Sequence, residues 1–268
     1  MQAVLTRHNL PTGSNPLGVG SHGVTMRWVL DKVSRRLAKY RRKRSVAEAH
    51  LRQRGAHRED YIELDNILGE FHASGGLSNK YRPYKLWNIN KLIYKYAPGS
   101  ILEFGSGSST VVLSRYARQN NARILSIDED NKWVENTKKL CNINTYDKID
   151  ILFARKRCYM DVSPPEIRYD VAISEQFDFV FIDGPSLETG GINHTEAINS
   201  NVFDLPHLPK VIVVDIRMAT AKHIADKYAN EYIVQFSDLF SGKPVKTDYN
   251  YLSVFLRKEQ SEESERMR

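Results

Sequence analysis

The stretch from Ile101 to Thr110 constrains the fold of this chain more than any other. Ile101 to Phe104 form a short apolar run with one acid in it, the pattern of a buried parallel strand. Gly105 and Gly107 come next, and the apolar positions after them predict a helix over residues 108–118. The stretch therefore predicts a strand, a tight turn and a helix whose first amides can bind a ligand carboxylate or phosphate.

Two details of this loop indicate which cofactor it would bind. A dinucleotide fingerprint has Gly or Ala at its last position, where this chain has Thr110, so NAD is disfavoured. Glu103 ends the strand two residues before the first glycine. A carboxylate there would repel a pyrophosphate and attract a ligand that carries an amino group and a sulfonium. S-adenosylmethionine is such a ligand.

Two later strands place further acids at the same sheet edge. Residues 123–128 form a short apolar pattern that ends in Asp128, and in a doubly wound sheet an acid there hydrogen-bonds the ribose of the cofactor. Residues 177–183 are nearly all apolar and end in Asp183. We expect both acids at the carboxyl edge, where open α/β sheets bind their ligands.

At these residues the chain resembles the class I S-adenosylmethionine-dependent methyltransferases, whose first motif is an acid, any residue, Gly, any residue and Gly. The resemblance covers residues from about Tyr84 to Lys258. It implies an α/β fold with a Rossmann-like, doubly wound, seven-stranded sheet that is mostly parallel and has an antiparallel last strand. The cofactor-binding residues that it implies are Glu103, Gly105, Ser106, Gly107, Thr110, Asp128 and Asp183.

Methyl transfer to a hydroxyl needs an acceptor held in line and a group that takes its proton. Asp183 and Asp215, which ends the strand predicted over residues 210–214, are the acids best placed for catalysis. In the metal-dependent oxygen methyltransferases of the family the corresponding acids bind a metal. The asparagine ligand and the lysine base of those enzymes are replaced here by Ile216 and Ser186, so we expect no metal.

The fourth motif also bears on the acceptor. Enzymes that methylate the amino groups of bases or of glutamine carry two prolines and an aromatic residue after the Asn or Asp of this motif. This chain has Gly184, Pro185 and Ser186 after Asp183, which favours an oxygen acceptor on a small molecule or glycan. An aminopropyl-type transferase of the same fold remains an alternative. A non-catalytic domain of this fold that binds lipid or nucleic acid is another.

The rest of the chain predicts elements of two kinds. Apolar periodicity indicates helices over residues 59–73, 84–96, 131–140, 193–203 and 219–228, and strands over residues 149–154, 232–236 and 249–256. Residues 155–176 contain two adjacent prolines and predict a long functional loop that folds over the adenine or the acceptor. Trp133, just behind Asp128, is a candidate for lining the adenine pocket.

A chain of 268 residues with 41% hydrophobic content can bury one α/β core and carry an appendage. We predict a disordered segment over residues 1–25, a basic helical extension over residues 26–76, the methyltransferase domain over residues 77–258 and a charged tail over residues 259–268. The two cysteines suit a reducing compartment. With no membrane span or secretory signal recognised, the expected location is the cytoplasm.

The net charge of +7 is unevenly distributed. Residues 27–58 contain twelve Lys or Arg against Asp31 and Glu48, a net charge of +10. Within them, Val33 and Leu37 belong to an apolar stripe at helical spacing. A helix of this kind could bind an anionic membrane surface or nucleic acid, or pack its stripe on the rest of the chain.

Overall fold

The computed structural model describes residues 54–76, 82–143, 146–236 and 252–258, together with isolated positions between 33 and 52. The chain divides into one unit that ends at Arg44 and a second that begins at Ser45, and the following account concerns the second. The predicted disordered segment, most of the basic helix and the charged tail lie outside the described residues. Within the described residues, no helix has the length and apolar character needed to cross a bilayer.

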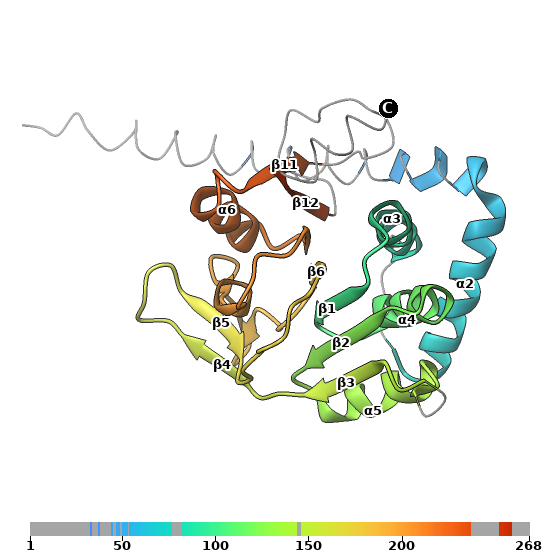
Figure 1. Ribbon diagram of the computed structural model, residues 1–268, viewed down its shortest axis with the longest axis horizontal. Coiled ribbons are helices and arrows are strands. Elements are labelled where there is room, and N and C mark those ends of the chain that lie inside the picture. Colours follow the sequence, from blue (N-terminus) through green and yellow to red (C-terminus); the bar gives the residue numbers. More distant parts are fainter. Residues whose placement is uncertain are drawn as a thin grey trace, which may run out of the picture. The chain divides into compact units, whose positions relative to one another are not determined.

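A seven-stranded sheet forms the centre of the second unit (Figure 1). Its strands lie in the order β11-β12-β10-β6-β1-β2-β3. They are β1 (Ser100–Phe104), β2 (Arg123–Asp128), β3 (Ile149–Phe153), β6 (Phe179–Ile182), β10 (Val211–Asp215), β11 (Tyr232–Phe236) and β12 (Leu252–Arg257). The neighbours from β3 to β10 pair in parallel, whereas β12 runs antiparallel to both β10 and β11. This arrangement confirms the predicted sheet with its antiparallel last strand.

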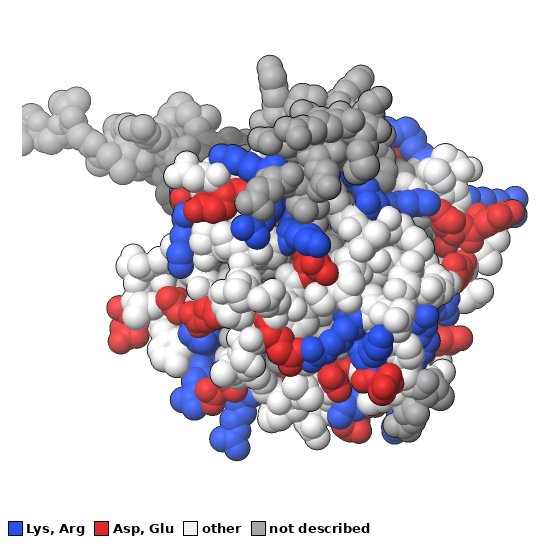
Figure 2. Space-filling view, in the orientation of Figure 1, with Lys and Arg blue, Asp and Glu red and all other residues white. Residues whose placement is uncertain are grey.

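Helices cover both faces of this sheet, as a doubly wound fold requires. They are α2 (Arg58–Ala73), α3 (Arg82–Tyr96), α4 (Ser108–Asn120), α5 (Asn131–Leu140) and α6 (Met218–Lys227). The central strands are apolar on both sides because each face is buried, and Phe179, Val180, Phe181 and Ile182 of β6 are all 0% exposed. Figure 2 shows acidic and basic side chains intermingled on the visible face.

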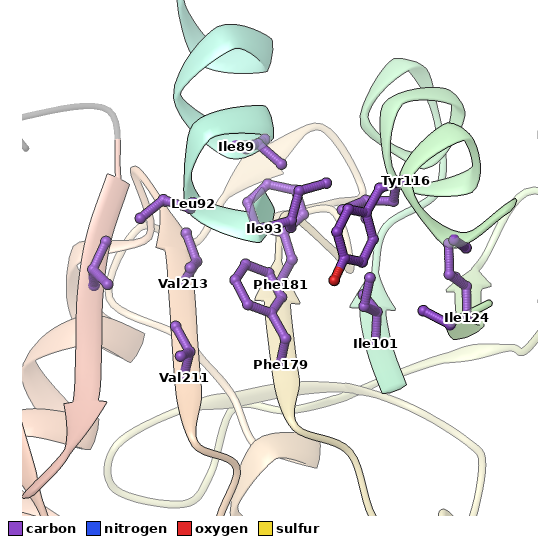
Figure 3. Close-up of a cluster of buried hydrophobic side chains, with 14 of the residues drawn as sticks. Ile89, Leu92, Ile93, Ile101, Tyr116, Ile124, Phe179, Phe181, Val211 and Val213 are labelled. Carbon is purple, nitrogen blue, oxygen red and sulfur yellow. The ribbon is translucent and has the colours of Figure 1, made fainter. Parts of the chain in front are cut away.

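One face of the sheet is packed by α3 and α4 (Figure 3). Ile89, Leu92 and Ile93 of α3 belong to one buried cluster with Phe181 and Val213 of the sheet. The opposite face is covered partly by α6. Alternate residues of the same strands point to each face, because successive side chains of a strand alternate. The buried side chains of α3 therefore pack directly against the sheet.

Helix α2 belongs to the same compact unit as the sheet, so the domain boundary predicted at residue 76 lies inside that unit. Leu64 and Leu68 of α2 share a buried cluster with Trp87 of α3 and Val111 of α4. Ile62 of the same helix is 52% exposed, whereas its neighbour Tyr61 is buried. The C-terminal end of α2 is thereby held beside the glycine loop.

Two predictions between β3 and β10 were wrong. The predicted loop 155–176 contains a hairpin of β4 (Lys156–Tyr159) and β5 (Glu166–Tyr169). The predicted helix 193–203 is replaced by three short elements. These three elements are β8 (Ile192–Asn193), β9 (Ile198–Asn199), which pairs with β5, and the 3-10 turn η2 (Asn201–Asp204). A further short strand, β7 (Glu188–Thr189), precedes them.

Asparagine side chains explain why this segment is not helical. Asn201 accepts a hydrogen bond from the Tyr169 amide at 2.7 Å and donates one to the Tyr169 carbonyl at 3.0 Å. Asn199 donates to the Gly184 carbonyl at 2.6 Å. Such side chains compete with the helical hydrogen bonds of the backbone, and here they attach the segment to β5 and to the turn after β6.

Candidate cofactor and acceptor site

A pocket of about 720 Å³ lies at the carboxyl edge of β1 and β6. Four parts of the chain line it: the end of α2, the glycine loop, the start of α5 and the turn after β6. The lining residues are Phe71, Ser74, Gly75, Ser106, Gly107, Ser108, Ser109, Asp130, Lys132, Trp133, Asn136, Asp183 and Ser186. Of the predicted cofactor-binding residues, Ser106, Gly107 and Asp183 line this pocket.

The turn after β1 depends on Gly105. Its φ of +97° is unfavourable for any residue with a side chain, and a Cβ there would lie 2.6 Å from the Gly184 nitrogen. The turn after β1 therefore lies directly against the turn after β6. This contact places the glycine loop and Asp183 on the same pocket.

Glu103 is not among the residues that line this pocket, and its predicted contact with the cofactor stays a prediction. Its side chain is 0% exposed and accepts hydrogen bonds from the hydroxyls of Thr110 at 2.6 Å and Ser126 at 2.7 Å. Burial raises the pKa of Glu103 to about 7, against the lowering effect of these hydrogen bonds. The Gly107 amide in turn donates to Thr110 at 2.8 Å. Glu103 and Thr110 therefore hold the loop from behind.

Asp128 ends β2 at the sheet edge, as predicted. Its carboxylate accepts from the Ser106 amide at 2.8 Å, from the Ser106 hydroxyl at 3.2 Å and from the Asp130 amide at 2.9 Å. Burial raises its pKa to about 6. These bonds join the glycine loop to the start of α5. The predicted contact of Asp128 with a ribose stays a prediction.

Asp183 and Asp215, the two predicted catalytic acids, lie at the ends of neighbouring strands, and a lysine lies between them. Lys85 of α3 donates to Asp183 at 2.7 Å and to Asp215 at 2.5 Å. Asp183 lines the pocket, whereas Asp215 lies behind it and is only 4% exposed. Burial and the adjacent Asp183 raise the pKa of Asp215 to about 7, although the Lys85 ammonium lowers it.

Lys85 was not predicted as a site residue. Its signal was its place on the buried stripe of α3, because Lys85, Ile89 and Leu92 recur at helical spacing and all three are buried. A lysine on such a stripe requires a buried acid. The acidic partner of Lys85 could not be assigned before the order of the strands was known, because several strands end in acids.

Trp133 was a candidate for the pocket and does line it. Its ring nitrogen donates to the Ser106 carbonyl at 3.0 Å, and its ring meets that of Phe71 edge-on at a centroid distance of 5.0 Å. The two aromatic rings join the end of α2 to the glycine loop. Phe71 was not predicted as a site residue, because a phenylalanine on an amphipathic helix is usually part of the core.

Glu129 joins the remaining walls of the site. It accepts from the Tyr169 hydroxyl at 2.9 Å and from the Ser186 amide at 2.8 Å. Burial, followed by the neighbouring acids Glu129 and Asp128, raises the pKa of Tyr169 well above its usual value. The hairpin β4–β5 is in this way tied to β2 and to the turn after β6. It forms part of the support of the site in place of the predicted loop.

A scan against protein-family models and a search of curated proteins gave no match. Among solved structures, an O-methyltransferase from Bacillus cereus bound to SAH is 14% identical, with a TM-score of 0.49 over 78% of this chain and 97% of that chain. The SAH-bound methyltransferase PaMTH1 of Podospora anserina is 12% identical, with a TM-score of 0.45 over 75% and 88%. The O-methyltransferase TomG of Streptomyces achromogenes, bound to SAM, is 13% identical, with a TM-score of 0.44 over 72% and 88%.

These values are low, and the assignment of the fold rests on the strand order and on the single antiparallel strand. The glycine turn follows β1, and acids lie at the carboxyl ends of β2, β6 and β10, which are the positions that the resemblance implied. The chain has a Rossmann-like, doubly wound α/β fold, with the mostly parallel sheet and antiparallel last strand that the resemblance to the class I S-adenosylmethionine-dependent methyltransferases implied.

Proposed function

We propose that the protein is an S-adenosylmethionine-dependent methyltransferase that acts on an oxygen acceptor of a small molecule or glycan. One observation carries the proposal: the glycine loop and the carboxylate of Asp183 line the same pocket. A cofactor held by the loop and an acceptor held at Asp183 would therefore meet. Proximity of this kind accounts for much of the catalysis of a displacement reaction.

The residues present fit this cofactor. A Cβ at Gly105 would fill the closest approach of the two turns, and the loop after it presents Ser106, Gly107 and Ser109 to the pocket. These residues, with the amides at the start of α4, would hold the aminoacyl part. Phe71 and Trp133 supply an apolar wall for the uncharged part of the ligand. When bound, the cofactor supplies an electrophilic methyl group.

Asp183 is the group that would take the proton of an acceptor hydroxyl. It lines the pocket, and its carboxylate is bonded on its deep side to the Lys85 ammonium. A positioned carboxylate can act as a general base for a hydroxyl within hydrogen-bond reach. Asp215 does not line the pocket, so its contribution goes through Lys85.

Calorimetry with S-adenosylmethionine and S-adenosylhomocysteine tests the cofactor. Binding of either, with no binding of NAD, supports the proposal, and failure of both to bind overturns it. Formation of S-adenosylhomocysteine with a panel of hydroxylated small molecules and glycans then tests the reaction. Turnover of decarboxylated S-adenosylmethionine alone would instead indicate an aminopropyl-type transferase. Binding without turnover across the panel would favour a binding protein.

The location of the protein in the cell stays a prediction, as does the role of the basic segment 27–58. Arg41, Arg42 and Lys43 lie outside the described residues. We propose a cytoplasmic enzyme whose basic segment associates with an anionic surface. The excess of cations in that segment supports this second part.

A further inference from the structure

Lys85 is a buried cation held by two carboxylates from adjacent strands. Strands β6 and β10 pair in parallel, so the acids at their carboxyl ends, Asp183 and Asp215, lie side by side at the sheet edge. Lys85 reaches both from α3, with its Nζ 2.7 Å from Asp183 and 2.5 Å from Asp215. The ammonium also lies 5.4 Å from the centre of the Phe181 ring. Three separate elements thus build one charged group.

The three side chains differ in their access to the pocket. Those of Lys85 and Asp215 are 4% and 6% exposed, whereas that of Asp183 is 25% exposed. Only Asp183 among them lines the pocket. Lys85 therefore contacts Asp183 from the protein side and leaves part of its carboxylate open to a ligand. A group so placed acts on the chemistry through Asp183.

The charges explain why the lysine is needed. Two adjacent carboxylates removed from water cannot both stay ionised unless a cation compensates them. Glu103, behind the loop, adds a third acid close enough to interact with Asp183. On the other side, Arg217 donates to the main-chain carbonyl of Asp183. Within the part of the chain that the structure describes, the Lys85 ammonium donates to both carboxylates.

We propose that Lys85 is a positioning residue that keeps Asp183 ionised and aimed at the acceptor, and that Asp215 serves to anchor the Lys85 ammonium. The inference rests on the proposed function in one respect, namely that Asp183 faces an acceptor hydroxyl. It implies that the cation beside Asp183, the proposed base, is a side chain of this protein, the Lys85 ammonium. It also implies that Asp215 influences the reaction only through Lys85.

The sharpest test compares two variants that each retain one carboxylate of the pair. Asp215→Asn keeps Lys85, and the double variant Lys85→Met with Asp215→Asn lacks it. The carboxyl carbon of Asp183 is followed through a pH titration by carbon-13 NMR, with Asp183→Asn for assignment. Removal of an opposite charge at hydrogen-bond distance should raise the titration midpoint of Asp183 by about one to three pH units. Equal midpoints in the two variants would overturn the proposal.

Two further variants separate charge from structure. Lys85→Arg, made together with Asp215→Asn, keeps the cation. It should return the titration midpoint of Asp183 at least halfway from the value of the double variant to that of Asp215→Asn, whereas a purely steric role predicts no recovery. Lys91→Met is the matched control, because Lys91 lies on the same helix, is 37% exposed and pairs with Asp60 at the surface. It should leave the midpoint unchanged. A shift as large as that of Lys85→Met would count against a local effect of Lys85.

Cofactor affinity distinguishes this proposal from the proposed function. Lys85 does not line the pocket, so calorimetry should give S-adenosylmethionine affinities for wild type and Lys85→Met within about threefold of each other. Absence of binding to the wild type would refute the proposed function, and the titration would still decide the role of Lys85. A much larger loss of affinity in Lys85→Met alone would show that Lys85 supports the cofactor loop instead, against the proposal.

Discussion

The hydroxyl of Thr110 donates a hydrogen bond of 2.6 Å to the carboxylate of Glu103, and both side chains are completely buried. This bond connects the end of β1 to the first turn of α4. The same hydroxyl accepts from the Gly107 amide, so one threonine fixes the strand, the turn and the helix relative to one another. The threonine that distinguishes this loop from a dinucleotide fingerprint has a structural role of its own.

Replacement of Thr110 should loosen the loop. Thr110→Val removes the hydroxyl and leaves Gly107 and Glu103 each without one partner, at a cost of about 1–3 kcal/mol in unfolding free energy. Affinity for S-adenosylmethionine should fall about tenfold or more, because the loop lines the pocket. Thr110→Ser keeps the hydroxyl and should retain most of both quantities. Denaturant unfolding and calorimetry measure them, and equal losses in the two variants would exclude the hydrogen bond as the cause.

Glu103 should make stability depend on pH. Its pKa is raised from 4.5 to about 7 in the folded protein, so the unfolded chain releases this proton at a lower pH. The associated stability is present below about pH 4.5 and is lost as pH rises through about 7. Glu103→Gln removes this loss. The change in unfolding free energy that it causes should therefore be about 2–3 kcal/mol more favourable at pH 8 than at pH 5.

Unfolding at both pH values, with Glu63→Gln as the control, measures this difference. Glu63 is 63% exposed on α2, and its replacement should give the same small change at both values. An effect of Glu103→Gln that does not vary with pH would show that the carboxylate is ionised throughout the range.

The turn after β1 should reject even one methyl group. Gly105→Ala combines a φ of +97° with a contact of 2.6 Å to the Gly184 backbone. Gly190→Ala has a φ of +59° with no atom within 4 Å, so it isolates the backbone strain from the clash. We expect Gly105→Ala to abolish cofactor binding or folding, and Gly190→Ala to cost about 1 kcal/mol at most. Cofactor binding by Gly105→Ala at wild-type affinity would contradict the packing of the two turns.

Much of the fold could be predicted because the strands are short, apolar and bounded by glycine or acid. The helices α3 to α6 follow from apolar stripes at helical spacing. Residues 193–203 could not be read correctly, because side-chain bonds of Asn199 and Asn201 to distant backbone groups replace helical bonds. The hairpin β4–β5 was missed because its strands are short and because β5 also pairs with β9, a distant strand of only two residues.

The site was predictable to the level of its loop and strand ends, and no further. Which strands end in acids is visible in the sequence, whereas the direction of each side chain depends on packing. Glu103 points into the core toward Ser126 and Thr110, and Asp183 points into the pocket, although both follow or end an apolar strand. Lys85 lies 98 positions before Asp183 and 130 positions before Asp215 in the sequence, so local patterns could not predict that it contacts them.

Chelation tests the expectation that no divalent metal is used. The Lys85 ammonium lies between Asp183 and Asp215, so we expect turnover on an identified acceptor to be unchanged after dialysis against EDTA. Added magnesium or manganese should have no effect on the rate. Loss of turnover that magnesium restores would show that the two acids bind a metal during the reaction.

The basic segment provides the last prediction. If it attaches the enzyme to an anionic surface, the attraction is electrostatic and should weaken steeply with salt. Replacement of Arg41, Arg42, Lys43 and Arg44 by serine should lower the affinity for vesicles that contain anionic lipid by about 4 kcal/mol at low salt, since each cation contributes about 1 kcal/mol.

These residues lie in the unit that ends at Arg44, separate from the one that carries the pocket. Affinity for S-adenosylmethionine should therefore stay the same, as calorimetry can check. Vesicle sedimentation that does not respond to salt or to the four substitutions would refute a role in surface binding, and loss of cofactor binding would show that the segment supports the catalytic unit.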